Sequence, residues 1–300
     1  MRPLSLVILM SWFSCSNNFA PYSNLSSPRV LAMRSEPAMP TANLPATFAA
    51  LTFVPAGMTS AYHWTYCPVA AKAADRYACP LPYIAASAVF GPSLPDYDLG
   101  TGSTASFTHG FAPAALASLC KTGITTPEYA EPVDCDLGFP ITLVLDLTTG
   151  ADTLRAAFQV YLPTDEQVVA NTNPNLEDLL ADGVPLTSEA LLVTPEKPTT
   201  INVVPAANAV EERPIPASEG KPGKRAERLT FSWFSDTGSW DKDRTSFLDG
   251  DTTLAAATTN PWTAPKADGL GKPALFYVVV RDDRGGVSWI ERQVPLAVRP

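Results

Sequence analysis

Two stretches of the chain alternate apolar and polar residues on either side of a short turn, and this pattern restricts the fold more than any other feature. The first is FPITLVLDLTTGADTLRAAFQVYLP, residues 139–163, and the second is LFYVVVRDDRGGVSWIERQVPLAV, residues 275–298. Successive side chains of a strand point to opposite faces, so alternation is typical of a strand with one buried face. Each stretch is therefore predicted to form a β-hairpin.

The register of the second hairpin follows from its apolar faces. If Arg281 pairs with Val287, then Val278 lies opposite Ile290 and the buried faces of both strands agree. This register leaves residues 282–286 as the loop, in which the Gly-Gly pair supplies positive-φ positions and an aspartate can bond its own backbone. We therefore interpret RDDRGG as a hairpin turn rather than as a reactive loop.

The first hairpin is organised in the same way, with Leu145 opposite Ala156 and Leu143 opposite Phe158. An aromatic-x-Trp segment precedes each hairpin, AYHWTY before the first and LTFSWFS before the second. An apolar strand, an aromatic-Trp strand, a long insertion and a final hairpin thus occur twice along the chain. This arrangement is a two-fold internal repeat.

Composition favours strands over helices. Thirty of the 300 residues are proline, which breaks helix interiors and central strands and is typical of chains with many loops and short strands. Hydrophobic residues make up 46% of the chain, which is enough to form a core, and the length suggests two domains. The sequence therefore predicts an all-β protein with two domains.

Motifs in both parts of the chain resemble known modules. FSW, NPWTAP and FYVVVRDDRGG resemble bacterial immunoglobulin-like domains of the PKD-like kind. PRVLAMRSEPAMP, ATFAALTFVP and YHWTYC resemble the first strands of similar modules in secreted bacterial lipoproteins. The resemblance implies two tandem immunoglobulin-like β-sandwich domains with long loop insertions, which serve as spacers, adhesins and binding modules alike. The domains are residues 28–165, with an insertion at 68–138, and residues 166–300, with insertions at 211–228 and 238–259.

The insertion at residues 68–138 is rich in Ala, Gly and Pro. We expect one short helix in it, Pro113 to Cys120, because proline suits the first helical position. Long loops in compact domains often carry binding residues, so the insertions of the second domain are also of interest.

The N-terminal residues 1–15 have the features of an export signal. Arg2 is followed by an apolar run that is too short to span a bilayer but suits a secretory signal. Cys15 directly after this run resembles the lipidated cysteine of bacterial lipoproteins, although Trp12 and Phe13 stand where that family prefers a leucine and a small residue. The alternatives are a plain signal peptide cleaved elsewhere and a wrongly assigned start codon.

The resemblance implies a lipid anchor at Cys15 and a location at the bacterial outer membrane, cell surface or periplasm. Residues 16–27 are polar and are expected to form a flexible tether between the anchor and the first domain.

Cysteine usage supports export. Apart from Cys15, the chain has four cysteines, an even number that fits disulfides in an oxidising compartment. Three pairings are possible, and we favour the local one, Cys67–Cys79 with Cys120–Cys135. A zinc site is disfavoured because it needs close Cys-x-x-Cys pairs, which these spacings do not supply.

Charge argues against nucleic acid as a partner. The net charge is −9 and the isoelectric point is near 4.7, whereas nucleic-acid binding needs a basic face. The basic cluster GKPGKRAER, residues 220–228, lies in a loop rich in Gly and Pro.

Catalytic signatures are weak. The two histidines are His63, which should point away from the core of its strand, and His109, in the long insertion near Ser103 and Ser106. No Gly-x-Ser-x-Gly elbow is present, and the α/β sheet that presents one is not expected. We therefore expect a protein that is not an enzyme, with a hydrolase as the least supported class.

An acidic loop is the best metal candidate. Calcium favours several carboxylate and carbonyl oxygens that converge from one loop. The spacing here does not match the helix-loop-helix calcium signature, so an ordinary solvated loop is the preferred interpretation and calcium is the alternative. The aspartates of this loop are Asp236, Asp241, Asp243, Asp249 and Asp251.

The alternation also predicts a large apolar outer face on the second domain. If Val278 points inward, then Tyr277, Val279 and Trp289 point outward, and Phe234 on the neighbouring strand faces the same way. An exposed apolar patch often marks an interface, so these residues form a possible interaction surface. The alternative is that an insertion or the first domain covers them.

The sequence thus favours an exported lipoprotein with a structural, adhesive or protein-interaction role and no cofactor. The other class to consider is a carbohydrate-binding surface protein that uses outward aromatic residues such as Trp240, Trp262 or Trp289 as stacking platforms.

Overall fold

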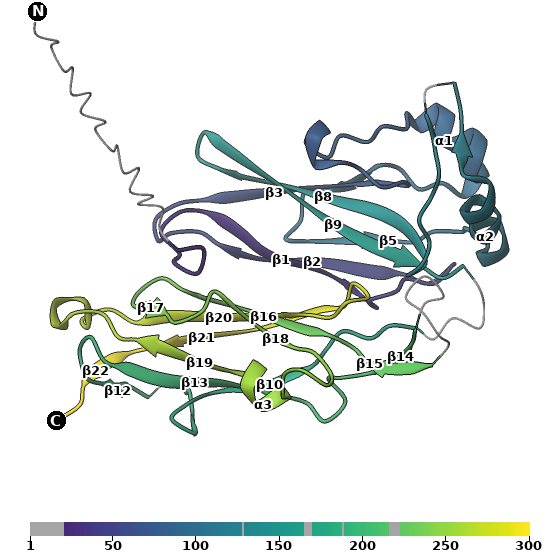
Figure 1. Ribbon diagram of the computed structural model, residues 1–300. Coiled ribbons are helices and arrows are strands. Elements are labelled where there is room, and N and C mark those ends of the chain that lie inside the picture. Colours follow the sequence, from purple (N-terminus) through teal and green to yellow (C-terminus); the bar gives the residue numbers. More distant parts are fainter. Residues whose placement is uncertain (1–20, 128, 165–169, 188, 216–222) are drawn as a thin grey trace, which may run out of the picture.

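The computed structural model describes residues 21–127, 129–164, 170–187, 189–215 and 223–300. These residues form antiparallel sheets that stack in layers, with few helices (Figure 1). The prediction of an all-β sandwich fold is therefore confirmed. We call residues 21–164 the first half and residues 170–300 the second half.

The first half contains two facing sheets. One has the order β1-β2-β5 and the other the order β4-β3-β8-β9. Between them lie fully buried side chains, including Phe48, Trp64, Phe107 and Leu143. The strands are β1 (Arg29–Glu36), β2 (Ala46–Phe53), β3 (Ser60–Cys67), β4 (Asp98–Gly100), β5 (Thr104–Phe107), β8 (Phe139–Thr149) and β9 (Asp152–Leu162).

The pairing of β8 with β9 matches the predicted hairpin. Leu145 lies opposite Ala156 and Leu143 opposite Phe158. The apolar alternation was sufficient to fix this register, because a shift by one residue would turn the buried face to solvent.

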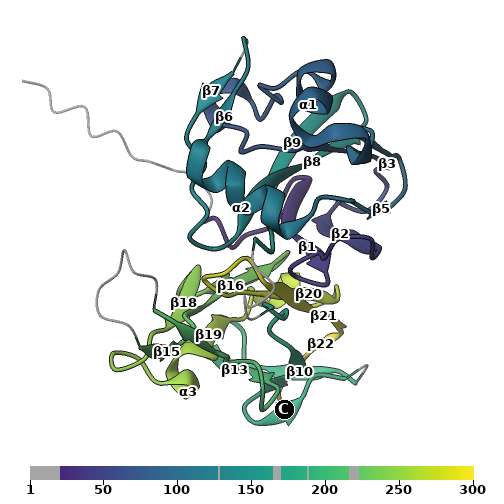
Figure 2. The same ribbon diagram turned by 90° about the vertical axis from the view of Figure 1, so that its right-hand side faces the viewer.

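The insertion at residues 68–138 covers the end of the first half with two short helices (Figure 2). The helix expected at Pro113–Cys120 is present and continues to Thr122. Disulfides join Cys67 to Cys79 and Cys120 to Cys135, which is the local pairing. The elements are α1 (Tyr83–Phe90), α2 (Pro113–Thr122), β6 (Ile124–Thr125), β7 (Ala130–Glu131) and the 3-10 turns at Ala73–Asp75 and Gly91–Ser93.

The second half has one sheet with the order β11-β10-β13-β19-β17 and a facing sheet with the order β18-β16-β20-β21. Two small pairs complete it, β14 with β15 and β12 with β22. The elements are β10 (Leu176–Ala181), β11 (Val184–Pro185), β12 (Leu191–Val193), β13 (Pro198–Pro205), β14 (Glu212–Pro214), β15 (Lys224–Ala226), β16 (Leu229–Ser235), β17 (Ser239–Trp240), β18 (Arg244–Phe247), α3 (Leu254–Ala257), β19 (Thr259–Thr263), a 3-10 turn (Ala267–Gly269), β20 (Ala274–Arg281), β21 (Val287–Val294) and β22 (Leu296–Val298).

The register of β20 and β21 is also as predicted. Arg281 pairs with Val287, Val278 with Ile290, and Val279 lies opposite Trp289. The inward face of β16, with Phe231 and Trp233, packs into the core of the second half.

The outward face of this sheet is covered from within the chain, which corrects the expectation of an exposed interaction surface. Phe234 and Val279 are 0% exposed and Tyr277 is 4% exposed. Trp289 is partly buried, and the Arg34 guanidinium lies 4.5 Å from its ring centroid. The covering residues belong mainly to β1, β2 and the segment before β1: Leu25, Leu31, Ala32, Leu51 and Phe53.

The two halves therefore stack with β1 and β2 against β16, β20 and β21 (Figure 2). A polar contact reinforces this packing, since Arg281 donates a hydrogen bond of 2.7 Å to the carbonyl oxygen of Leu31. Burial of the outward apolar face removes it from water and fixes the orientation of the halves.

We expect Phe234→Ala to lower the free energy of unfolding by about 3–5 kcal/mol, because it deletes a fully buried ring between the halves. Urea denaturation followed by circular dichroism measures this change. Leu192→Ala, at a side chain that is 46% exposed, serves as the control and should change stability little. A Phe234→Ala loss as small as that of the control would show that the contact does not stabilise the fold.

Removal of either disulfide should lower the free energy of unfolding by about 2–4 kcal/mol, because each bond closes a short loop in the unfolded chain. The cysteines are separated by 12 residues in one case and 15 in the other. The measurement compares urea midpoints before and after reduction, and for the pair Cys120→Ala with Cys135→Ala. An unchanged midpoint after complete reduction would contradict this expectation.

Candidate functional site

The turn between β20 and β21 is built around Asp282. Its Oδ1 accepts hydrogen bonds from the backbone N–H of Arg284 at 2.8 Å and of Gly286 at 2.7 Å. Its Oδ2 accepts a hydrogen bond from the side chain of Asn171 at 3.1 Å. Asp282 thus closes the turn as predicted, and a Cβ on Gly286 would lie 2.1 Å from its Oδ2.

The next two residues of the turn reach the β14–β15 hairpin. Asp283 Oδ2 lies 2.9 Å from Arg213 Nη2 and 3.5 Å from Arg225 Nη2. Arg284 forms ion pairs with Glu227, and with Glu211 at 2.7 Å. We call these six residues, 211, 213, 225, 227, 283 and 284, the ion-pair network.

Much of this network is buried. The side chains of Glu227 and Arg213 are 1% and 3% exposed, and that of Arg284 is 8% exposed. Burial, together with the nearby Asp282 carboxylate, raises the pKa of Glu227 to about 7. The hydrogen bond from Arg284 opposes this shift.

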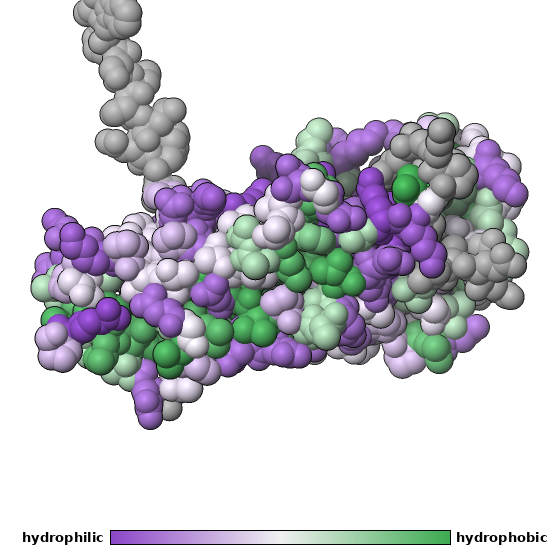
Figure 3. Space-filling view, turned by 60° about the horizontal axis from the view of Figure 1, so that its bottom comes forward, coloured by the Kyte–Doolittle hydropathy of each residue, from purple (hydrophilic) through white to green (hydrophobic). Residues whose placement is uncertain are grey.

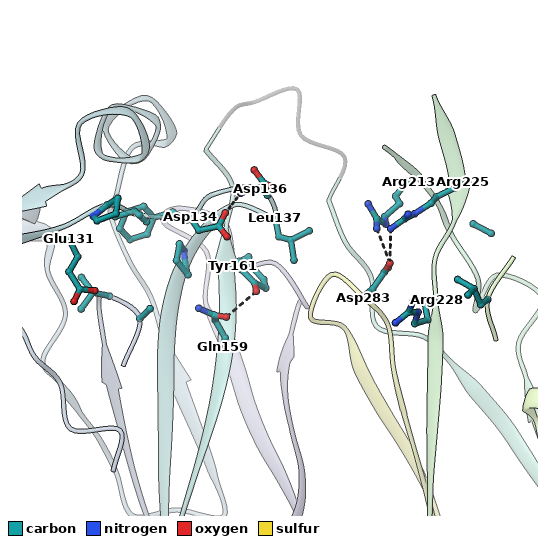
Figure 4. A pocket seen from close by; sticks show the side chains of 18 of the residues that line it. Glu131, Asp134, Asp136, Leu137, Gln159, Tyr161, Arg213, Arg225, Arg228 and Asp283 are labelled. Atoms are coloured by element: carbon teal, nitrogen blue, oxygen red, sulfur yellow. Dashed lines mark hydrogen bonds and ion pairs between the residues drawn. The ribbon is translucent and has the colours of Figure 1, made fainter. Parts of the chain in front are cut away.

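A cleft of about 550 Å³ lies beside the network, between the two halves. Figure 4 shows its two sides. We call it the charged cleft. The first half contributes Val69, Ala70, Tyr129, Glu131, Pro132, Val133, Asp134, Asp136, Leu137, Phe139, Pro140, Gln159 and Tyr161, and the second half contributes Arg213, Arg225, Ala226, Arg228, Leu248 and Asp283.

The two walls of the charged cleft carry opposite charges. The first-half wall has Glu131, Asp134 and Asp136, and the second-half wall has three arginines, of which Arg213 and Arg225 contact Asp283 (Figure 4). Asp134 and Asp136 lie on the connection between β7 and β8, whereas Glu131 ends β7 and forms an ion pair with Lys72 at 2.5 Å. The backbone N–H of Asp136 donates to Asp134 Oδ1 at 3.1 Å.

Aromatic and aliphatic side chains line the space between the charged walls. The hydroxyl of Tyr161 hydrogen-bonds to Gln159 Oε1 at 3.0 Å, and its ring lies close to Gly285. Burial raises the pKa of the Tyr161 phenol, and the nearby Asp134 carboxylate adds to the shift. Tyr129, Leu137 and Phe139 complete this surface.

The prediction that outward tryptophans serve as stacking platforms for carbohydrate is wrong for Trp240 and Trp262, which are buried. Trp262 is 0% exposed and its Nε1 donates to the carbonyl oxygen of Thr237. Trp240 is buried against Trp233 and Phe276. Trp289 lies under Arg34 at the contact between the halves. The indole rings of Trp240 and Trp262 fill space in the core of the second half, and Trp289 is partly buried.

The acidic loop does not gather into a metal site. Asp236 accepts a hydrogen bond from the backbone N–H of Leu275, and Asp243 accepts one from that of Ser23. Within the described ranges, no group of three or more His, Cys, Asp or Glu residues is placed to hold a metal ion.

The histidines occupy unrelated places. His63 points away from the core, as expected, and lies 3.3 Å from Asp98. His109 is buried between Phe107 and Phe111, and burial lowers its pKa. Its Nδ1 accepts a hydrogen bond from the backbone of Phe111. No hydrogen bond in the described structure joins His109 to a serine or carboxylate side chain.

The proposed lipidation residue Cys15 lies outside the described residues. Among the residues described, no helix is long and apolar enough to cross a membrane. The two disulfides fit a protein of an oxidising compartment.

The residues of the ion-pair network were not singled out from the sequence. Glu211 begins the insertion at residues 211–228 and Glu227 lies near its end, and Arg225 and Arg228 belong to the basic cluster. The sequence contains a basic cluster and a charged turn with Asp283, but nothing in it indicates that the two meet.

A second exposed feature lies at the edge formed by β11, β12 and β22. Apolar side chains gather in patches on the face of the second half in Figure 3. Exposed apolar residues of this edge are Val184, Leu192 and Val298, and a hollow of about 280 Å³ lies beside them. This hollow is smaller than the charged cleft and lacks its opposed charged walls.

Comparisons with known proteins give little guidance. No protein-family model matches the chain, and no curated protein matches its sequence. Similar solved structures include three domains of the outer capsid protein Hoc of bacteriophage RB49, at 9% identity and a TM-score of 0.21, over 90% of this chain and 59% of that one. The adhesin InvE of Yersinia pseudotuberculosis matches at 11% identity and a TM-score of 0.22, over 92% of this chain and 61% of that one.

Red sea bream transglutaminase matches at 10% identity and a TM-score of 0.25, over 92% of this chain and 32% of that one. The chain thus spans less than two thirds of each of these structures. Similarity at this level says nothing about activity, so function has to be argued from the molecule itself.

We expect the stability of the protein to depend on the ionisation of Glu227. Between pH 4.5 and about 7, the folded state keeps a proton on Glu227 that the unfolded state has lost, so this contribution is full below pH 4.5 and is lost as the pH rises to 7. The free energy of unfolding of the wild type relative to Glu227→Gln should therefore fall by about 3 kcal/mol across this range and stay constant above it.

Urea denaturation at a series of pH values measures this difference. Glu212→Gln, at an exposed residue of β14, is the matched control. A difference between wild type and Glu227→Gln that is independent of pH would contradict the raised pKa.

Proposed function

We propose that this chain is an exported, lipid-anchored protein without enzymatic activity that presents the charged cleft to a partner. The coarse features of the molecule, an all-β sandwich fold with two disulfides, fit an extracytoplasmic interaction module.

The observation that carries this proposal is the placement of the cleft relative to the start of the described chain. Ser23 and Asn24 lie beside Ser235, at the end of β16. At the other end of the same strand, Thr230 pairs with Arg281, which leads into the turn that borders the cleft. About 17 Å of strand separates the two ends, so an anchor before residue 21 would be attached at the end of β16 that lies away from the cleft.

The anchor itself rests on the sequence. An apolar run followed by Cys15 resembles a lipoprotein signal. The tether expected over residues 16–27 is corrected in its second part, because Ser23 and Leu25 are buried and hydrogen-bonded to Ser235, so a tether would have to lie before residue 21. We further propose that the halves are two immunoglobulin-like domains, residues 28–165 and 166–300, the second of the PKD-like kind.

Two features support an interaction role over the alternatives. Asp283 and Glu211 of the ion-pair network are paired with arginines and serve as structural charges. Glu227, whose pKa is raised to about 7, is 1% exposed and is not among the residues that line the charged cleft. Of the tryptophans named for the carbohydrate-binding alternative, Trp240 and Trp262 are buried, and Trp289 is partly buried with the Arg34 guanidinium over its ring. A protein partner is therefore preferred over a glycan.

We expect the mature protein to be labelled in cells by a palmitate analogue, and Cys15→Ala to abolish the label, because a thioether at this cysteine would carry the lipid. In-gel fluorescence after a click reaction measures the labelling. Cys135→Ala, which removes a disulfide cysteine instead, is the control and should keep the label. Unchanged labelling of Cys15→Ala would refute the lipid anchor.

A further inference from the structure

The charged cleft has the size and position of a ligand site. Its volume of about 550 Å³ lies within the range of roughly 300–1,000 Å³ that is typical of such sites, which often occur where two units of a protein meet. Both halves line it, and their relative orientation is fixed by the buried contact between β1–β2 and the β16–β20–β21 sheet. The cleft is therefore a preformed space.

Each wall of the cleft is held rigidly. The disulfide Cys120–Cys135 fastens the connection that carries Asp134 and Asp136 to α2. On the other side, the ion pairs of Arg284 hold Glu211 and Glu227, which flank the β14–β15 hairpin. A ligand that enters such a space orders few side chains, so less of its binding energy is lost.

The charge pattern selects the kind of ligand. A cation is favoured beside Asp134, and an anion is favoured beside Arg228 on the opposite wall. A polyanion would be repelled by the acidic wall, and a ligand with only positive groups by the arginine wall. Between the walls, the rings of Tyr129 and Tyr161 offer a surface for the aliphatic stem of a long side chain.

We infer that the charged cleft binds an extended peptide segment of a partner protein that carries a basic and an acidic side chain close together. The basic side chain lies over the tyrosines with its cation at Asp134, and the acidic side chain lies at Arg228. The volume of the cleft exceeds what one amino acid fills, so neighbouring residues of the segment enter with them. This inference rests on the proposed interaction role and names the partner's chemistry.

The test uses fluorescein-labelled peptides in which a lysine and a glutamate are separated by zero to three glycines, in both orders. Control peptides replace the lysine by norleucine or the glutamate by glutamine. Fluorescence anisotropy with the purified, disulfide-bonded chain should show saturable binding for at least one dipolar peptide, and each control should bind roughly tenfold more weakly. Binding should weaken as salt is raised.

Variants of the chain locate the binding. The double variant Asp134→Asn with Asp136→Asn should bind the dipolar peptide roughly three- to tenfold more weakly than the wild type, and Arg228→Gln alone should do the same. Asparagine at 134 keeps the oxygen that accepts from the backbone of residue 136, so the turn is retained. The matched control is Asp152→Asn with Lys266→Gln, two exposed residues outside the cleft, which should leave affinity unchanged. Melting temperatures verify that all variants are folded.

Three outcomes would overturn the inference: no saturable binding by any dipolar peptide at millimolar concentration, equal binding of the control peptides, or affinity insensitive to the cleft variants. A free lysine–glutamate mixture that competes as well as the linked peptides would also overturn it. These results are independent of the labelling of Cys15. If in-cell cross-links to a partner formed only from positions outside the cleft, the interaction role would be supported and this binding site would be rejected.

Discussion

The apolar contact between the two halves is the interaction on which the rest of the structure depends. The β16–β20–β21 sheet is apolar on both faces, so it needs cover on both sides. The second half supplies one cover, and β1 and β2 of the first half supply the other over Phe234, Tyr277 and Val279. Because burial of such a face is worth several kcal/mol, the halves have one preferred orientation. The charged cleft exists only because that orientation brings residues 129–140 opposite the β14–β15 hairpin.

The local sequence pattern was sufficient to predict the strands and their pairing, but not to predict which residues cover their outer faces. Both hairpin registers were predictable, since Leu145 opposite Ala156 and Val278 opposite Ile290 each satisfy a buried face. The outward direction of Tyr277 and Val279 followed from the same alternation. What lies over them did not, because an apolar face has the same sequence pattern whether it meets another protein, solvent or a distant strand of its own chain. The tryptophans illustrate the same limit, since a ring suited to stacking on a sugar is equally suited to a core.

The candidate site was beyond sequence reasoning for a different reason. Its ion pairs join residues that lie far apart along the chain, such as Arg213 with Asp283 and Arg284 with Glu227. Charge alone does not indicate which of many carboxylates an arginine meets, because pairing depends on backbone positions set by the folded sheets. The short helix and the local disulfides were accessible because their partners are close in sequence.

The residues of the charged turn RDDRGG contribute both to the fold and to the candidate site. The Asp282 carboxylate accepts hydrogen bonds from the backbone of the turn, whereas the side chains of Asp283 and Arg284 form ion pairs with residues in and beside the β14–β15 hairpin. A buried ion pair seldom adds much stability, because desolvation offsets the attraction between the charges. The raised pKa of Glu227 reflects this cost. The pair is therefore better understood as a device for orientation: an apolar replacement would fill the space but would not hold the hairpin at a defined angle. That angle sets where Arg225 lies in the cleft, while the apolar contact between the halves sets which walls face each other.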